Sequence, residues 1–548
     1  GGLAEALISI DRKEQGIPAL FFCYSQGILE KEVVGTSCPT QKVSCKEDIM
    51  SQTFEQFQAY QTRLEQYDQA IALLYWDLQT AAPKDSIEAK LSAVGYFSTE
   101  SFRLSTADEY GSLLKKLSAP EEYDQLSPAM QLTIRRNLRD FERFQRIPEA
   151  FYTEYVTEKA RSEKAWEAAK EASDFSVFAP HLDKVISMTK EYVHYMEPDQ
   201  DVYEFLVGLF EDGMDTETID RIFAELKEGL LPLLAKIEAA PKPDLSALQQ
   251  TFDPDAQKKV QELLLSYIGF SFDCGAVAES MHPFTTTLCP GDVRVTNHYY
   301  ADNPISSMFS AIHEGGHAIF EQNVDKDFWH TAAAQINMMG LHESQSRFYE
   351  NILGRNPHFW TPIYEKMSEL LPEFKTIPFD TFVKAINDVH PSMIRTEADE
   401  VTYGLHIILR YEIEKAIFRD NVKTDDLPAL WNQKMQELLG ITPANDAEGI
   451  LQDMHWSDGS FGYFPSYLLG SIYDGMYLEA IQKDLGDLDT VLENGRILDI
   501  THWLKEKIHR FGSMYNSKEV IERVCGKEIS AQPLLRYFEE KYSKVYEF

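Results

Sequence analysis

The chain has 548 residues, of which 44% are hydrophobic, enough to bury a large core. Its 88 acidic residues outnumber its 52 basic ones and give a formal net charge of −36, which argues against binding to nucleic acid or to anionic membranes. Six cysteines without a CxxC pair or zinc-finger spacing argue against a disulfide scaffold, and no apolar run approaches the ~18 residues of a membrane span. We therefore expect a soluble, cytoplasmic protein.

Residues 1–49 differ from the rest of the chain. They mix glycine, short apolar runs and half of the cysteines, without sustained helical periodicity. From Met50 the pattern changes, because apolar residues recur at helical spacing in "MSQTFEQFQAYQTRLEQYDQAIALLYWDLQT". We predict a boundary here, with residues 1–49 forming an N-terminal extension of unknown role, either natural or added by cloning.

Helical patterns dominate the chain after Met50. Residues 127–147 and 149–173 are rich in helix formers and place apolar residues three and four apart. Residues 239–259 cluster proline and aspartate, which predicts an internal linker between two helical halves of the molecule.

One segment predicts a short strand instead. In "GDVRVTNHYY", residues 291–300, valines alternate with polar residues. An extended segment just before the helix discussed next could pair its backbone with an extended peptide, as the edge of a sheet does, or it could be an ordinary surface hairpin.

The segment "NPISSMFSAIHEGGHAIFEQN" predicts a buried helix that carries two histidines four residues apart. On a helix, His313 and His317 face the same way and can reach one metal ion. Glu314 projects about 100° away from His313 around the helix, which suits a general base beside the metal better than a third ligand. Two interior glycines, each less favourable than alanine by about 1 kcal/mol, indicate the close approach of another helix or of substrate. The pattern therefore favours a catalytic metal site.

A catalytic metal needs a third protein ligand. Glu343, in the helical pattern of residues 338–353, lies 26 residues after His317 (343 − 317). This spacing leaves room for a loop and an antiparallel return to the metal, but His342 and Glu350 compete for the role.

Several motifs together resemble the carboxypeptidase Taq family of metallocarboxypeptidases. The resemblance runs from about Met50 to the end of the chain and rests on motifs in the family's order: "LLYWDLQTAAP", "HPF", "DVRVT", "HEGGH", "HESQSR", "IRTEADEVTYGLHIILRYEIE" and "GILQDMHWSDGSFGYFPSYLLG". It leaves only the extension unexplained.

The resemblance implies Glu343 as the third ligand and a single catalytic domain from residue 50 to residue 548. It implies a mainly α fold, a helical two-sided clam with a deep active-site groove and a small β element, similar to neurolysin and angiotensin-converting enzyme. It also implies a homodimer with one zinc or cobalt ion per subunit, which releases single C-terminal residues from peptides with broad specificity.

Substrate-binding residues follow from the chemistry of the reaction. A bidentate arginine recognises a free carboxylate best, so Arg395 is the first candidate, followed by Arg347 and Arg294. Each could instead form a structural ion pair. The oxyanion that develops during hydrolysis needs a donor besides the metal. His455 and Tyr463 resemble the residues with this role in the angiotensin-converting enzyme group.

Two other functions stay open. An oligoendopeptidase or a dipeptidyl carboxypeptidase could use the same scaffold, and the groove could belong to a non-catalytic peptide-binding protein. We further expect poor release of terminal Asp and Glu, because one arginine matches only one carboxylate. Terminal Pro should also be released poorly, because its tertiary amide lacks an N–H.

Overall fold

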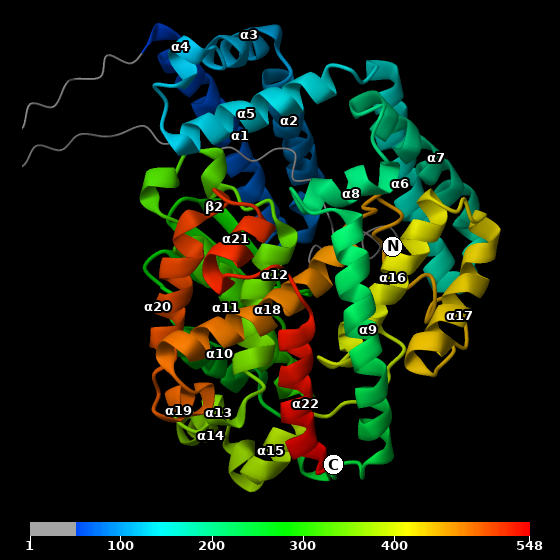
Figure 1. Ribbon diagram of the computed structural model, residues 1–548, viewed down its shortest axis with the longest axis vertical. Coiled ribbons are helices and arrows are strands. Elements are labelled where there is room, and N and C mark those ends of the chain that lie inside the picture. Colours follow the sequence, from blue (N-terminus) through cyan, green and yellow to red (C-terminus); the bar gives the residue numbers. More distant parts are fainter. Residues whose placement is uncertain (1–50) are drawn as a thin grey trace, which may run out of the picture.

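The computed structural model describes residues 51–548 (Figure 1), so the predicted extension and its boundary lie outside the described residues. The helices expected after Met50 are confirmed as α1 (Gln52–Thr80), α5 (Pro128–Phe144) and α6 (Glu149–Ala172). Helices α1 and α5 begin at serines whose side chains accept a hydrogen bond from the backbone N–H three residues later.

The other helices complete a mainly α fold. In chain order they are α2 (Ile87–Ser105), α3 (Asp108–Leu117), α4 (Pro120–Tyr123), α7 (Ala179–Met196), α8 (Val202–Phe210), α9 (Thr216–Ala239), α10 (Pro254–Ile268), α11 (Pro304–Gln322), α12 (Met339–Arg347), α13 (Pro357–Trp360), α14 (Tyr364–Leu370), α15 (Phe379–Ile386), α16 (Thr402–Phe418), α17 (Leu427–Leu439), α18 (Phe464–Leu485), α19 (Leu488–Glu493), α20 (Ile497–Lys507), α21 (Ser517–Cys525) and α22 (Gln532–Tyr546). A π-helical turn (Phe348–Leu353) follows α12 directly.

The described residues contain one small sheet, made of β1 (Gly275–Glu279), β2 (Thr285–Cys289) and β3 (Asp292–Asn297). The predicted strand within residues 291–300 is confirmed as β3. Of the two alternatives for this strand, the free edge is wrong, because β3 is the central strand, parallel to β1 and antiparallel to β2, with which it forms a hairpin. Both of its backbone edges are therefore paired, and β2 forms the edge nearer the histidine helix, α11.

Among residues 51–548, the buried hydrophobic side chains form one large core, a smaller core and two minor clusters of three residues each. The smaller core joins α1, α3 and α5, which lie together in the blue and cyan part of Figure 1. The large core runs from α6 to α22 and includes residues on both sides of the predicted linker. That segment contains the end of α9, a connection and the start of α10, so the two helical halves share a single core.

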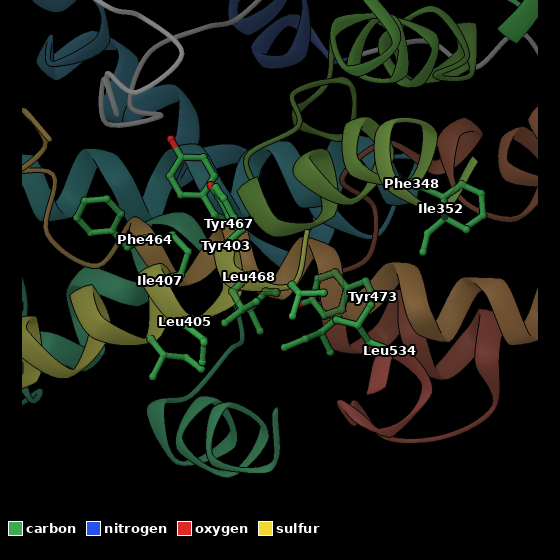
Figure 2. Packing of buried hydrophobic residues seen from close by; sticks show 14 of the residues in the cluster. Phe348, Ile352, Tyr403, Leu405, Ile407, Phe464, Tyr467, Leu468, Tyr473 and Leu534 are labelled. Carbon is green, nitrogen blue, oxygen red and sulfur yellow. The ribbon is translucent and has the colours of Figure 1, made fainter. Parts of the chain in front are cut away.

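Helix α18 passes through the middle of the large core, and 15 of its 22 residues are buried. Figure 2 shows Tyr467, Leu468 and Tyr473 of this helix among side chains from the π-helical turn, α16 and α22. Among residues 51–548, no helix combines the length and the hydropathy that crossing a lipid bilayer requires.

Candidate metal centre and active site

Helix α11 carries the histidine pair and packs tightly against two other helices. A Cβ at Gly315 would lie 2.6 Å from the Ile268 side chain of α10. A Cβ at Gly316 would lie 2.6 Å from the backbone oxygen of Gln345 in α12. The expectation that these glycines mark a close helix approach is confirmed. Gly316 in particular lets α12, which carries Glu343, reach α11.

Three side chains converge between these two helices. One ligand atom from each of His313, His317 and Glu343 lies within 4.8 Å of the other two. The His317 Nε2 atom is 3.6 Å from a carboxylate oxygen of Glu343. Nitrogen and oxygen atoms this close together suit the coordination sphere of one divalent ion.

The two predicted competitors for the third ligand position have other partners. Glu350, in the π-helical turn, lies 2.6 Å from Nδ1 of His313, so Nε2 is the nitrogen available to a metal ion. The burial of Glu350 would raise its pKa, but His313 and nearby arginines lower it to about 2. His342 stacks on the His317 ring, and its Nε2 is 3.0 Å from Glu321.

The Glu343 carboxylate is buried and held by an arginine one turn later. Arg347 donates from Nε to Glu343 Oε1 at 2.6 Å. Burial would raise the pKa of Glu343, but Arg347 and the two histidines outweigh it and keep the pKa well below its usual range. The side chain is therefore an anion at neutral pH, as a metal ligand must be.

Glu314 is 1% exposed and is held from the sheet. The Thr285 hydroxyl, at the start of edge strand β2, lies 2.8 Å from Glu314 Oε2 and 2.9 Å from the Glu314 backbone oxygen. The contact fixes one carboxylate oxygen next to the histidine pair.

The three candidate arginines all form ion pairs with acidic side chains. Arg347 is paired with Glu343, as described above, and Arg294 forms a bidentate pair with Asp292. Arg395 is 3% exposed and donates from Nε and Nη2 to Asp453, at 3.1 and 2.9 Å.

A tyrosine links two of these arginines. Arg395 Nη1 donates to the Tyr403 hydroxyl at 3.0 Å, and the Arg347 guanidinium lies 3.8 Å from the centre of the Tyr403 ring. Arg395 thereby lies one side chain away from the pair formed by Glu343 and Arg347. Figure 2 shows Tyr403 beside Tyr467, and their ring centres are 6.5 Å apart.

His455 and Tyr463 lie together at the two ends of one loop. Their rings are stacked with centres 5.7 Å apart, and the His455 side chain is fully buried. Burial, followed by the neighbouring Glu343 charge, raises the pKa of Tyr463 well above its usual value. Burial lowers the pKa of His455 to about 3, so its ring is neutral.

Sequence reasoning missed several contacts of the site. The Glu343–Arg347 pair has the i,i+4 spacing of a helical ion pair, a signal that was present. Asp453 stands two residues before His455, yet nothing in the sequence pairs it with Arg395. Thr285 has no sequence signal, because its contact with Glu314 depends on how β2 packs on α11.

A half-buried histidine pair with an adjacent buried carboxylate, completed by a glutamate from a second helix, defines the class as a helical metallohydrolase. The family model of carboxypeptidase Taq (M32) metallopeptidases matches residues 56–542. The chain belongs to this family.

Known proteins resemble this chain in sequence and structure over most of its length. Carboxypeptidase 1 of Bacillus subtilis is 45% identical over 486 residues, covering 88% of this chain and 97% of that protein. Thermostable carboxypeptidase 1 of Thermus thermophilus is 35% identical over 486 residues, covering 87% and 95%. The crystal structure of the M32 carboxypeptidase from Deinococcus radiodurans R1 matches with a TM-score of 0.86 at 30% identity, covering 91% of this chain and 100% of that one. The structure of Pyrococcus furiosus carboxypeptidase matches with a TM-score of 0.85 at 35% identity, covering 90% and 100%. The chain is thus a metallocarboxypeptidase, a hydrolase that uses a divalent metal and acts on peptides.

Proposed function

We propose that the protein releases single C-terminal residues from peptides with broad specificity, using one divalent ion held by His313, His317 and Glu343. The observation that carries the proposal is the convergence of these three side chains next to the buried Glu314. Zinc is our first choice for the ion, with cobalt as the alternative, because two imidazoles and a carboxylate suit both. When bound, the ion would polarise the peptide carbonyl and lower the pKa of the attacking water.

Glu314 is proposed as the general base that accepts the proton of this water. Its position directly after His313 places it beside the metal ligands but on a different side of the helix. The Thr285 hydroxyl holds one of its oxygens, which orients the carboxylate. The same group can return the proton to the leaving amine.

Arg395 is proposed as the anchor for the terminal carboxylate of the substrate. Its Nε and Nη2 atoms are held by Asp453, whereas Nη1 bonds to the Tyr403 hydroxyl. A substrate carboxylate can take the place of the phenol without breaking the ion pair. Arg347 is less suited because it holds the proposed metal ligand Glu343. Arg294 is less suited because it pairs with Asp292 without a second arginine, whereas Arg395 and Arg410 share Asp453.

Tyr463 is proposed as the donor to the oxyanion, with His455 behind it. Phe210 of α8 packs edge-on against the Tyr463 ring, with centres 4.9 Å apart, and Tyr467 packs on another side at 5.0 Å. A phenol fixed by its neighbours can donate to developing charge without reorganising.

The remaining features follow the family resemblance. We propose that residues 50–548 form one catalytic domain, a two-sided clam with a deep groove, similar to neurolysin and angiotensin-converting enzyme. We also propose that the enzyme acts as a cytoplasmic homodimer.

A pair of peptides tests whether the enzyme acts at the free C-terminus and how many residues it releases at a time. The two peptides share one sequence, and one ends in a free carboxylate whereas the other ends in an amide. Stepwise release of single residues from the first, with loss of activity on the second, supports the proposal. Internal fragments would favour an oligoendopeptidase, and released dipeptides a dipeptidyl carboxypeptidase. Stoichiometric metal without any turnover would favour a peptide-binding protein.

A further inference from the structure

A buried carboxylate on α16 lies behind the loop that carries His455 and Tyr463. Glu414 is fully buried, and three groups donate to it. The Trp456 indole N–H donates to Oε1 at 2.8 Å, and the Gly462 backbone N–H donates to Oε2 at 3.0 Å. The third donor is the Tyr203 hydroxyl of α8, which is 2.8 Å from Oε2.

Two of these donors stand at opposite ends of the loop. Trp456 directly follows His455, and Gly462 directly precedes Tyr463. A single carboxylate therefore fastens both ends of residues 455–463. The third donor belongs to a different part of the fold and does not hold the loop.

The Gly462 end of the loop has no freedom to shift inward. Gly462 has a φ of +86°, and a Cβ there would lie 2.6 Å from the backbone carbon of Leu206 in α8. Backbone of α8 thus blocks the loop from one side, and the carboxylate holds it from within the core. Both contacts act on the residue next to the proposed oxyanion donor.

We propose that Glu414 is a positioning residue for peptide hydrolysis, which fixes where His455 and Tyr463 lie by holding Trp456 and Gly462. The inference rests on the function proposed above, because Glu414 acts only through these two residues. It is too deep to touch substrate, and it has no contact with the metal ligands. Loss of the hydrogen bonds from Trp456 and Gly462 to Glu414 should lower the rate of the chemical step and leave metal binding intact.

The substitution Glu414→Gln tests this role with little change in volume. The single carbonyl oxygen of glutamine can accept from Tyr203 and Gly462 or from Trp456, but not from all three. One end of the loop is therefore released. We expect kcat to fall by about 10- to 100-fold, because a displaced oxyanion donor loses much of its effect. The KM should change by less than about twofold, and the bound metal should stay at the wild-type level.

Tyr203→Phe is the matched control, because it also removes one hydrogen bond to Glu414 but leaves both loop contacts. The kcat of Tyr203→Phe should fall by less than about threefold, although this variant, like Trp456→Phe, loses one hydrogen bond to Glu414. Trp456→Phe removes the indole N–H that donates to Glu414 and so releases one end of the loop by changing the donor. It should reproduce the loss of kcat expected for Glu414→Gln. It also serves as the test if Glu414→Gln does not fold. Equal losses of kcat in Tyr203→Phe and Trp456→Phe would show a general structural effect and overturn the proposal.

A double-mutant cycle separates this inference from the proposed function. In a Tyr463→Phe background, Glu414→Gln should lower kcat by less than about threefold, because the proposed oxyanion donor is gone and His455 acts only behind it. A full additional loss would overturn the positioning role while leaving the proposed function intact. If Tyr463→Phe alone kept the wild-type kcat, the proposed role of Tyr463 would fail, and the positioning role with it.

Discussion

The substitution Gly316→Ala should separate the two helices that supply the metal ligands. The new Cβ would lie 2.6 Å from the Gln345 backbone oxygen and 2.8 Å from the Ser346 Cα, where an ordinary contact begins at 3.4 Å. Backbone atoms cannot rotate away, so α12 must retreat by roughly 0.8 Å, several times the ~0.2 Å tolerance of a metal–ligand distance. We expect the affinity for zinc to weaken by about 10- to 100-fold, the size of effect seen when groups that support metal ligands are changed. Overpacking should also lower the free energy of unfolding by about 1–3 kcal/mol, partly offset by the higher helix propensity of alanine.

Gly315→Ala on the same helix is the control for this experiment. Its Cβ meets the side-chain ends of Ile268 and Leu265, at 2.6 and 2.8 Å, and these methyl groups can rotate. Both variants gain the same helix propensity, so the difference between their zinc affinities reports the effect of the contact between Gly316 and α12. Zinc affinity is measured by titrating the apoprotein against a competing colorimetric chelator. Wild-type affinity in Gly316→Ala, or equal losses in both variants, would refute the reasoning.

Three further predictions concern the chemistry. Glu314→Gln should lower kcat by about 100- to 10,000-fold while metal analysis finds the ion still bound, and substantial turnover in this variant would rule out the general base. Glu350→Gln should weaken metal binding by about 10-fold or more in a chelator competition, because an amide orients the His313 ring less firmly than a carboxylate does; unchanged affinity would contradict this role. On peptides that differ only in the last residue, release of terminal Asp, Glu and Pro should be slow, and the penalty for Asp and Glu should shrink as salt rises from about 20 to 500 mM. Efficient release of terminal Glu at low salt would argue against the electrostatic explanation.

The sequence predicted those parts of the site that depend on local periodicity. The i,i+4 spacing of His313 and His317 requires only a helix, and the interior glycines indicated close neighbours, which are α10 at Gly315 and α12 at Gly316. The choice of Glu343 over Glu350 could not be made from spacing alone, because the π-helical turn changes the register after Arg347. That turn brings Glu350 to His313 as a hydrogen-bond partner, and only the family resemblance had favoured Glu343.

Long-range pairing accounts for what the sequence could not predict. The pattern of β3 indicated a strand, but a strand's place in a sheet depends on which segments pair with it. The flanking strands β1 and β2 have weaker patterns, so the central position of β3 was not foreseen. In the same way, nothing local joins Glu414 to residues 42 and 48 positions later in the chain.

The charge around Arg395 fits its proposed role of holding a substrate carboxylate in an acidic protein. Arg395 shares Asp453 with a second buried guanidinium, that of Arg410, whose Nε is 2.5 Å from the other carboxylate oxygen. Two histidines near this group, His406 and His455, are neutral, because burial first and the two arginines next lower the pKa of each to about 3. Arg395, Arg410 and Asp453 together carry one positive charge, buried where water screens it poorly. Glu414, one helical turn after Arg410, offsets this charge only in part, because burial raises the pKa of Glu414 to about 7. One substrate carboxylate neutralises that charge, whereas a second finds no uncompensated partner in this group. With Arg395 in its proposed role, recognition of a peptide end would rest on a local excess of positive charge within a chain of net charge −36.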